Sequence, residues 1–253
     1  MASSLNAILT QNRRQVYVLR LPLEAEDNII SQFERTLARE EAAHAARFRL
    51  DYLRRRFIIN RASLRIILAN YLHTDPSRVQ FSYGPNGKPH VDNPAGLQFS
   101  TSHSGDLTLL AFALHCRIGV DVECIRSVPD GIDIARRFFH PQEIADLESL
   151  TPSDREQAFF LCWTRKEAYV KASGDGLSMP LNCFRVTLQP ANVAQPLPFP
   201  STTDDATWTM HDLSAPPSYT ATVVYEDLPR PVYIASLAAP SCLLDRKCDH
   251  RAL

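Results

Sequence analysis

Two acidic residues, Asp121 and Glu123, alternate with valine in the segment 119–123 (GVDVE). Successive side chains of a β-strand point to opposite faces, so a strand here would place both carboxylates on one face. Such close negative charges repel unless a cation joins them, and Mg²⁺ prefers a few hard oxygen ligands beside water and phosphate oxygens. The pattern indicates a magnesium site for a phosphorylated substrate. The alternative is an edge strand with solvated acids.

A second motif with possible chemistry is WTRKEAYVK at residues 163–171, in a segment with helical character. Trp163, Glu167 and Lys171 are four residues apart and share one side of that helix. Glu167 would serve as a third metal ligand or as a base, and Lys171 would meet negative charge developing on a phosphate. The alternative is an ordinary Glu–Lys surface pair beside a core tryptophan, worth about 0.3–0.5 kcal/mol.

Hydroxyl groups and one imidazole are concentrated at residues 99–105 (FSTSHSG), between two predicted strands. Loops of this kind expose backbone N–H groups and short donors that suit a phosphate. Just upstream, Lys88 adds a positive charge on the turn Gly87-Lys88-Pro89. The alternative is that His103 forms only local hydrogen bonds.

Basic charge is concentrated between His44 and Arg65, where Asp51 is the one acid. The arginines of this cluster are Arg47, Arg49, Arg54, Arg55, Arg56, Arg61 and Arg65. The whole chain has a net charge of −1 and so exerts no strong pull on nucleic acid. The cluster could still hold an anion, and a solvated helix face is the alternative.

The elements that must position these residues alternate between helices and strands. Helices are predicted at 29–46, 52–71 and 141–150, and from 151 to the glycines at 174 and 176. Strands are predicted at 15–21, 79–83, 97–100, 107–114, 118–123, 184–188, 207–212, 220–225 and 232–235. Because a block of helices and strands occurs twice, we expect an α+β protein of two similar subdomains, 1–117 and 118–253.

Composition narrows the class of protein. Of the 253 residues 45% are hydrophobic and 22% charged, which is ordinary globular usage. Six cysteines form no CxxC pair and follow no secretory signal, so reduced cytoplasmic thiols are expected in place of disulfides or a zinc site. No apolar run approaches the roughly 18 residues that a membrane helix needs, so no membrane association is expected.

Together these segments resemble the 4'-phosphopantetheinyl transferase superfamily, in particular the larger single-chain, surfactin-synthetase-activating type, which serves carrier proteins of secondary metabolism and fatty-acid synthesis. The likeness runs from about Arg47 to Val186. It is carried, in the family's order, by GKP at 87–89, FSTSHS at 99–104, GVDVE at 119–123, RRFF at 136–139 with Glu143, and WTRKEAYVKASGDGLS at 163–178. Of these, the GVDVE and WxxKEAxxK motifs are specific to the family.

The resemblance implies an enzyme that transfers the 4'-phosphopantetheine group of coenzyme A to a serine of an apo acyl or peptidyl carrier protein, with 3',5'-ADP as second product. It implies two similar halves packed as a pseudo-dimer with the active site between them, Mg²⁺ as cofactor, and a monomer that needs no nucleic acid or membrane. The rival functions are another Mg²⁺-dependent enzyme of nucleotide or phosphoester chemistry and a non-enzymatic anion-binding or nucleic-acid-binding module.

The resemblance also implies roles for single residues. Asp121, Glu123 and Glu167 match the metal ligands, and Glu167 and Lys171 match the catalytic pair. Positions that bind coenzyme A are matched by Arg56, Lys88, Ser102, His103, Asp121 and Lys171. Glu41 and His44 stand where the best-known members have lysines, so His44 and the arginine cluster are candidates for the adenine-side phosphate contacts.

Overall fold

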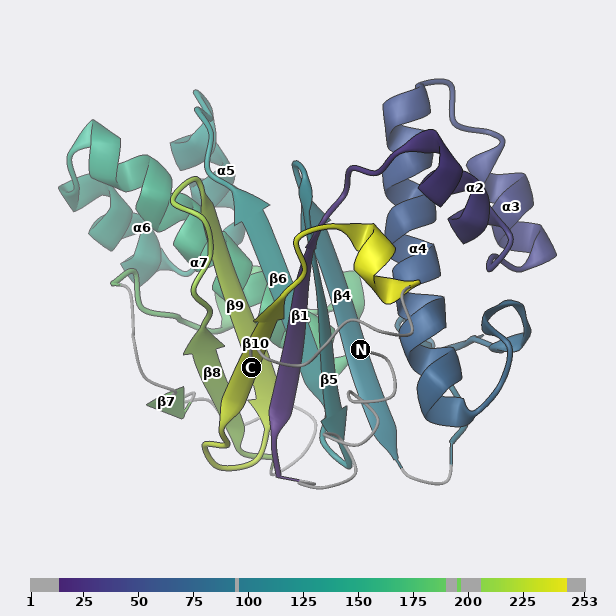
Figure 1. Ribbon diagram of the computed structural model, residues 1–253. Coiled ribbons are helices and arrows are strands. Elements are labelled where there is room, and N and C mark those ends of the chain that lie inside the picture. The colour runs from purple at the N-terminus through teal and green to yellow at the C-terminus, as the bar shows by residue number, and fades with distance from the viewer. Residues whose placement is uncertain (1–13, 94–95, 190–194, 197–205, 245–253) are drawn as a thin grey trace.

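The computed structural model of the protein describes residues 14–93, 96–189, 195–196 and 206–244. It is an α+β structure in which two sheets meet in the middle and helices cover their outer sides (Figure 1). In the described ranges no helix is both long and apolar enough to cross a lipid bilayer.

The first sheet has the strand order β10-β1-β5-β4. Its strands are β1 (Val16–Pro22), β4 (Leu97–Ser104), β5 (Leu107–Leu114) and β10 (Val232–Ser236). β1 pairs antiparallel with β5 and parallel with β10, so the last strand of the chain joins the sheet that the first strand began. The long helix α4 (Asp51–Leu72), with α2 (Asp27–Glu34) and α3 (Arg39–Ala45), covers this sheet (Figure 1).

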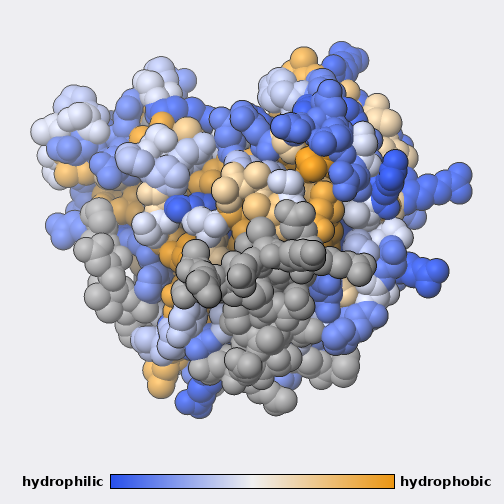
Figure 2. All heavy atoms as spheres, viewed as in Figure 1, coloured by the Kyte–Doolittle hydropathy of each residue, from blue (hydrophilic) through white to orange (hydrophobic). Residues whose placement is uncertain are grey.

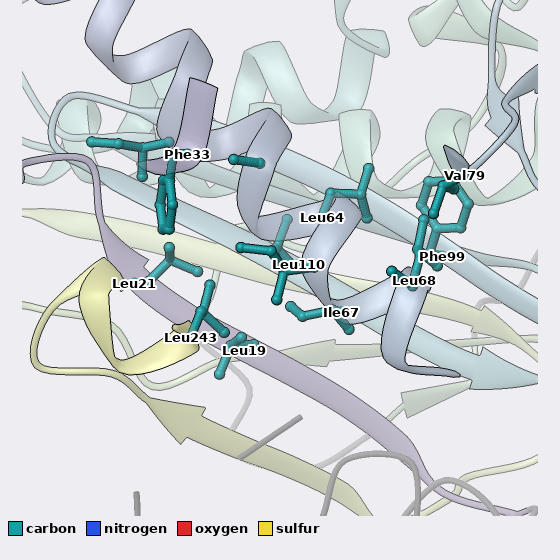
Figure 3. Close-up of a cluster of buried hydrophobic side chains, with 14 of the residues drawn as sticks. Leu19, Leu21, Phe33, Leu64, Ile67, Leu68, Val79, Phe99, Leu110 and Leu243 are labelled. Carbon is teal, nitrogen blue, oxygen red and sulfur yellow. The ribbon is translucent and has the colours of Figure 1, made fainter. Parts of the chain in front are cut away.

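Apolar side chains on one side of α4 join it to the sheet. Leu64 and Ile67 lie near Leu110, and Leu68 lies near Phe99, as Figure 3 shows. Leu64, Leu68 and Tyr71 of this helix are buried, whereas Leu53 near its start is exposed. This packing makes α4 a core element, although it begins with an arginine-rich segment.

The second sheet has the order β6-β9-β8-β7. Its strands are β6 (Ile118–Cys124), β7 (Gln195–Pro196), β8 (Trp208–Asp212) and β9 (Tyr219–Glu226). The helix α7 (Pro152–Ser173) packs on its outer side together with α5 (Gly131–Phe138) and α6 (Pro141–Ser149). Tyr169 of α7 meets the buried Trp208 edge to face, with ring centroids 5.5 Å apart. A further apolar cluster, with members such as Val18, Leu109, Val120 and Val223, lies between the two sheets.

The remaining elements are short. The strands β2 (Ser82–Tyr83) and β3 (Pro89–His90) form a two-stranded hairpin around the 84–88 turn. Among the described residues, 3-10 turns lie at Pro76–Arg78, Gly176–Ser178, Leu181–Cys183 and Pro240–Leu243.

Most predicted elements exist, but several were wrong in extent or type. The helix expected at 29–46 is two helices, because the chain turns after Glu34, where the Thr36 hydroxyl bonds to Phe33 O at 2.7 Å. The strand expected at 79–83 is reduced to Ser82–Tyr83, and the helix α5 was not foreseen. The hydroxyl-rich segment expected to be a loop continues β4 as far as Ser104.

The strand predicted at 184–188 is absent from the described chain, for a reason that lies in the core. The Val186 N–H donates to the buried Glu143 carboxylate at 2.6 Å, and Phe184 O accepts from Lys166 Nζ at 2.7 Å. The backbone here is satisfied by two buried side chains from α6 and α7, so it needs no strand partner.

The two sheets meet at the edges of β4 and β6, which do not pair through their backbones. Serine hydroxyls of β4 accept hydrogen bonds from alternate N–H groups of β6 instead. Val120 N donates to Ser100 Oγ at 3.1 Å, Val122 N to Ser102 Oγ at 3.4 Å, and Cys124 N to Ser104 Oγ at 3.1 Å. We call these three hydrogen bonds the serine joint. It satisfies edge groups that would otherwise be unpaired.

The turn of the β2–β3 hairpin also joins the two halves, through hydrogen bonds to the C-terminal end of α7. Lys88 Nζ donates to Ala172 O at 3.2 Å and to Ile118 O at 3.0 Å, and Asn86 Nδ2 donates to Gly174 O at 3.0 Å. A cation suits the last carbonyl groups of a helix, which carry partial negative charge. Lys88 thus ties the first half of the chain to both β6 and α7.

Gly119 allows α7 to lie directly on β6. A β-carbon at this position would overlap two backbone atoms of the helix, Ala168 O and Ala172 N. We expect Gly119→Ala to lower the free energy of unfolding by about 3 kcal/mol or more, because backbone atoms cannot move aside as a side chain can. Urea unfolding measures this. Gly131→Ala is the control, since a β-carbon there would lie 3.6 Å from the nearest atom, Val128 Cβ. Equal losses of unfolding free energy in the two variants would contradict the close contact.

Burial makes Lys88 sensitive to pH. Desolvation, helped by the nearby Arg117 charge, lowers the pKa of Lys88 from 10.5 to about 8 in the folded protein. Between these pH values the unfolded chain holds more protons, so a rise in pH stabilises the folded state. We expect the free energy of unfolding of the wild type to rise relative to that of Lys88→Met between pH 8 and 10.5. Asn86→Ala, which keeps the amine, should run parallel to the wild type; a parallel Lys88→Met curve would refute the pKa shift.

Candidate active site

The acidic strand has the two faces that its alternation predicted. Val120 and Val122 lie in the apolar cluster between the sheets. Gly119 touches α7, and Asp121 and Glu123 follow it on the same face, as the period of two along a strand requires. Asp121 is buried and Glu123 half-buried. The carboxylates therefore face the helix that carries Glu167 and Lys171.

Lys171 reaches from α7 to the acidic strand. Its Nζ lies 2.6 Å from Asp121 Oδ1 and 3.1 Å from Ser102 Oγ. Within the described chain Glu167 takes part in no ion pair, so Lys171 does not form the intrahelical Glu–Lys pair considered as the alternative. The structure thus brings together residues from β4, β6 and α7.

Trp163 belongs to the packing of α7 and not to this group. Its ring centroid lies 6.1 Å from those of Phe139 and Phe159, in the apolar cluster of the second half. The side of α7 that carries Trp163, Glu167 and Lys171 therefore has two roles. Trp163 packs in the apolar core, and Glu167 and Lys171 lie near the acidic strand.

The acidic residues place several negative charges close together in a half-buried site. Burial raises the pKa of Glu167, and the charges of Asp121 and Glu123 raise it further. Burial likewise raises the pKa of Glu123, with Asp121 contributing. Asp121 Oδ2 is buried and has no hydrogen-bond partner among the described residues. The charges of Lys171 and Arg126 oppose these shifts at Glu123 but do not reverse them.

These donors fit a divalent cation in type and charge, since all are hard carboxylate oxygens. They are not assembled for one: within the described ranges no three His, Cys, Asp or Glu side chains stand in a metal-binding group. Lys171 Nζ bonds one oxygen of Asp121. Binding one cation would therefore require some of these side chains to turn toward a common point.

Two cavities contain residues that the sequence singled out, and one of them is lined by members of this group. One, of about 290 Å³, is lined by Lys88, Thr101, Glu167 and Lys171, together with glycines 87, 174 and 176. Its walls come from both halves of the chain. Because it holds two cations and a carboxylate among small residues, it can accept an anionic group close to Glu167 and Lys171.

The second cavity, of about 510 Å³, lies between α3, α4 and the β2–β3 hairpin. His44 and His103 line it with Arg61 and Tyr83. His44 packs edge-on against Phe57, with ring centroids 4.9 Å apart. Burial, and then the charges of Lys171 and Arg56, lower the pKa of His103. The two histidines that the sequence singled out thus share one cavity.

Two other predicted contacts have partners within the chain. The Ser102 hydroxyl donates to Asp121 Oδ1 at 2.7 Å and accepts from Val122 N, so it belongs to the serine joint. Arg56 forms an ion pair with Asp106. Arg56 does not line either of the two cavities described above.

The arginine cluster is largely neutralised by acids from elsewhere in the chain. Ion pairs join Arg54 to Glu34, Arg55 to Asp27, and both Arg61 and Arg65 to Glu41. The Glu41 carboxylate therefore pairs with two of the arginines that were predicted to bind a phosphate. Hydrophilic residues nevertheless cover much of the visible surface of the α2–α4 lobe, as Figure 2 shows.

Sequence reasoning missed two features of the site. Ser104 Oγ donates to Glu123 Oε2 at 2.7 Å, and the alternation of serine at 100, 102 and 104 was the available signal. Lys166 of the WTRKE motif is buried, and its Nζ lies 2.9 Å from Oε2 of the buried Glu143. This ion pair joins α7 to α6. A lysine next to Glu167 in sequence thus points away from the site.

Comparisons with known proteins agree with this geometry. The profile of the 4'-phosphopantetheinyl transferase superfamily matches residues 117–224, and that of the N-terminal part of 4'-phosphopantetheinyl transferase matches residues 24–115. The 4'-phosphopantetheinyl transferase HetI of Nostoc sp. is 38% identical over 190 residues, which cover 74% of this chain and 80% of HetI.

Two Bacillus proteins are also similar. The 4'-phosphopantetheinyl transferase Sfp of Bacillus subtilis is 31% identical over 178 residues, covering 70% of this chain and 77% of Sfp. The 4'-phosphopantetheinyl transferase psf-1 of Bacillus pumilus is 34% identical over 160 residues, covering 63% of this chain and 67% of its own. From its likeness to these proteins over both halves, the chain belongs to the 4'-phosphopantetheinyl transferase superfamily, of the larger type that Sfp represents.

Proposed function

We propose that this protein is an enzyme that transfers the 4'-phosphopantetheine group of coenzyme A to a serine of an apo acyl or peptidyl carrier protein. The products are the holo carrier protein and 3',5'-ADP. The observation that carries the proposal is the 290 Å³ cavity, where Glu167 and Lys171 meet Lys88 beside the acidic strand. It combines a proton acceptor with cations that suit a pyrophosphate.

Glu167 and Lys171 divide the chemistry between them. Glu167 lines the cavity and takes the proton of the carrier serine as the general base. The serine oxygen then bonds to phosphorus while the bond to 3',5'-ADP breaks. Lys171, already 2.6 Å from Asp121, stabilises the negative charge that develops on the phosphate oxygens.

Asp121, Glu123 and Glu167 hold Mg²⁺ in this proposal. The cation supplies neutralisation of the pyrophosphate charge and polarisation of its phosphorus. The unpartnered Asp121 Oδ2 and the mutual repulsion of the three carboxylates support this assignment. In this proposal Asp121 and Lys171 also lie close to the pyrophosphate of coenzyme A.

Coenzyme A extends across both cavities in our proposal. Lys88 contacts the pyrophosphate side, and His44 and His103 contact the adenine-side phosphate in the larger cavity. Ser102 contributes from the serine joint. Arg56 takes part only if its ion pair with Asp106 opens.

The finer architecture is also a proposal. Residues 1–117 and 118–253 form two similar subdomains packed as a pseudo-dimer, with the active site between them. Residues from both subdomains line the smaller cavity, which supports an active site between them. The strand β10 departs from this division, because it belongs to 118–253 but pairs with β1 in the first sheet. Since one chain supplies all the residues of the site, a monomer suffices.

The location and partners follow from the same proposal. The described cysteines, Cys116, Cys124, Cys162, Cys183 and Cys242, are free thiols, which supports a cytoplasmic enzyme. Nucleic acid is not a proposed partner, because the arginines at 54–65 are paired internally. The family relationship and the cavity also disfavour the two rivals, another phosphoester enzyme and a non-enzymatic binding module.

One assay tests the function. The protein is mixed with coenzyme A, Mg²⁺ and a panel of apo carrier proteins, and mass spectrometry follows the addition of phosphopantetheine. We expect transfer by the wild type and a loss of about 10²–10³-fold in kcat for Lys171→Ala at saturating coenzyme A and carrier protein. Trp163→Phe, a packing change, is the control for stability. Release of AMP or phosphate without carrier modification, or a fully active Lys171→Ala, would contradict the proposal.

The acidic residues make a separate prediction about metal-free protein. Glu167→Gln removes a half-buried charge that faces Asp121 and Glu123, so we expect a higher melting temperature than the wild type in EDTA. Adding Mg²⁺ should raise the melting temperature of the wild type more than that of the variant. Glu156→Gln, on the same helix but beside a different cavity, is the control. A Glu167→Gln protein that melts lower in EDTA would show that the carboxylate is satisfied without a cation.

A further inference from the structure

The serine joint connects the two sheets to the acidic residues in a regular way. Each of its three hydroxyl oxygens accepts one N–H of β6, from Val120, Val122 or Cys124. A hydroxyl that accepts a hydrogen bond still has its own proton to donate. Where that proton goes distinguishes the three serines.

Two of the three protons go to carboxylates. Ser102 donates to Asp121 Oδ1 and Ser104 donates to Glu123 Oε2, each at 2.7 Å. In both cases the carboxylate belongs to the residue just before the N–H that the serine accepts. For Ser100 that residue is Gly119, which has no side chain. Ser100 therefore joins the two sheets without contacting a carboxylate of β6.

We propose that Ser104 is a positioning residue that holds the Glu123 carboxylate for the metal ion. The proposal rests on the proposed function, in which Glu123 is a metal ligand. The Ser104 oxygen is fixed by Cys124 N at 3.1 Å, so its proton points toward one carboxylate oxygen, Oε2. That bond limits rotation of the carboxylate and leaves Oε1 for the cation.

Ser104 isolates this role better than Ser102 does. The Ser102 hydroxyl also accepts from Lys171 Nζ at 3.1 Å, so its removal would disturb the catalytic lysine as well. Ser104 touches Glu123 and the β6 backbone, and Ser100 provides the matching contact without a carboxylate. The comparison of Ser104→Ala with Ser100→Ala therefore separates the positioning of Glu123 from the joining of the sheets.

The test measures cation binding by the full chain, without coenzyme A or carrier protein. Mg²⁺, or Mn²⁺ as a substitute, is titrated by calorimetry against the wild type, Ser104→Ala, Ser100→Ala and Ser104→Thr. We expect Ser104→Ala to weaken binding about 10–100-fold, the usual effect of losing such a supporting hydrogen bond. Ser100→Ala should stay within about twofold of the wild type, and Ser104→Thr, which keeps the hydroxyl, should bind as the wild type does.

Melting temperatures give the second readout. Both alanine variants should melt lower than the wild type, because each loses a bond of the joint, but only Ser104→Ala should lose part of its stabilisation by Mg²⁺. If Ser104→Ala does not fold, Ser104→Cys fills the same space with a weak donor and serves in its place.

Three outcomes would overturn the inference: unchanged cation affinity in Ser104→Ala, equal losses in Ser104→Ala and Ser100→Ala, or no cation binding by the wild type. The carrier assay judges the function separately. Transfer by a wild type whose Ser104→Ala variant binds Mg²⁺ normally would refute only the role of Ser104. Weakened Mg²⁺ binding in Ser104→Ala, with no transfer by the wild type, would support that role and refute the function.

Discussion

The contact between α7 and β6 at Gly119 is the constraint on which the site depends. Backbone atoms of Ala168 and Ala172 occupy the space where any other residue would have its β-carbon. Because the helix lies this close to the strand, Lys171 reaches Asp121 two residues further along β6. A larger separation would leave the carboxylates of β6 and the polar end of α7 in separate environments.

Buried charges fix the rotation of α7 about its own axis. Lys166 is fully buried against Glu143 and donates to Leu181 O and Phe184 O, both at 2.7 Å. Arg165, also buried, pairs with Asp212. Such pairs add little net stability, but separating them is costly, so the helix cannot turn freely. With these two residues directed into the core, the next residue, Glu167, is directed toward the acidic strand and the smaller cavity.

The site also depends on how the two halves are joined. The edges of β4 and β6 meet through side-chain hydroxyls, and Lys88 binds carbonyl groups of both β6 and α7. These hydrogen bonds satisfy the strand edges and keep β4 close to α7, and residues of both elements line the smaller cavity. The joint and the site are therefore made of the same few residues, and a change in one alters the other.

The sequence by itself determined what depends on near neighbours. The alternation in GVDVE set the two faces of β6, and Thr151, Pro152 and Gly174 marked the ends of α7, because strand periodicity and helix caps involve residues only a few positions apart. The family motifs also lie within such short segments.

Only the tertiary structure decided which of these residues meet. Lys171 pairs with Asp121 across 50 positions instead of with Glu167 four positions away, and the Ser104 hydroxyl finds Glu123 across 19. Periodicity could not show that Glu41 would pair with both Arg61 and Arg65, or that buried side chains would replace a strand at 184–188. These outcomes depend on how sheets and helices pack, and packing brings together charges and hydrogen-bonding groups that no local pattern relates.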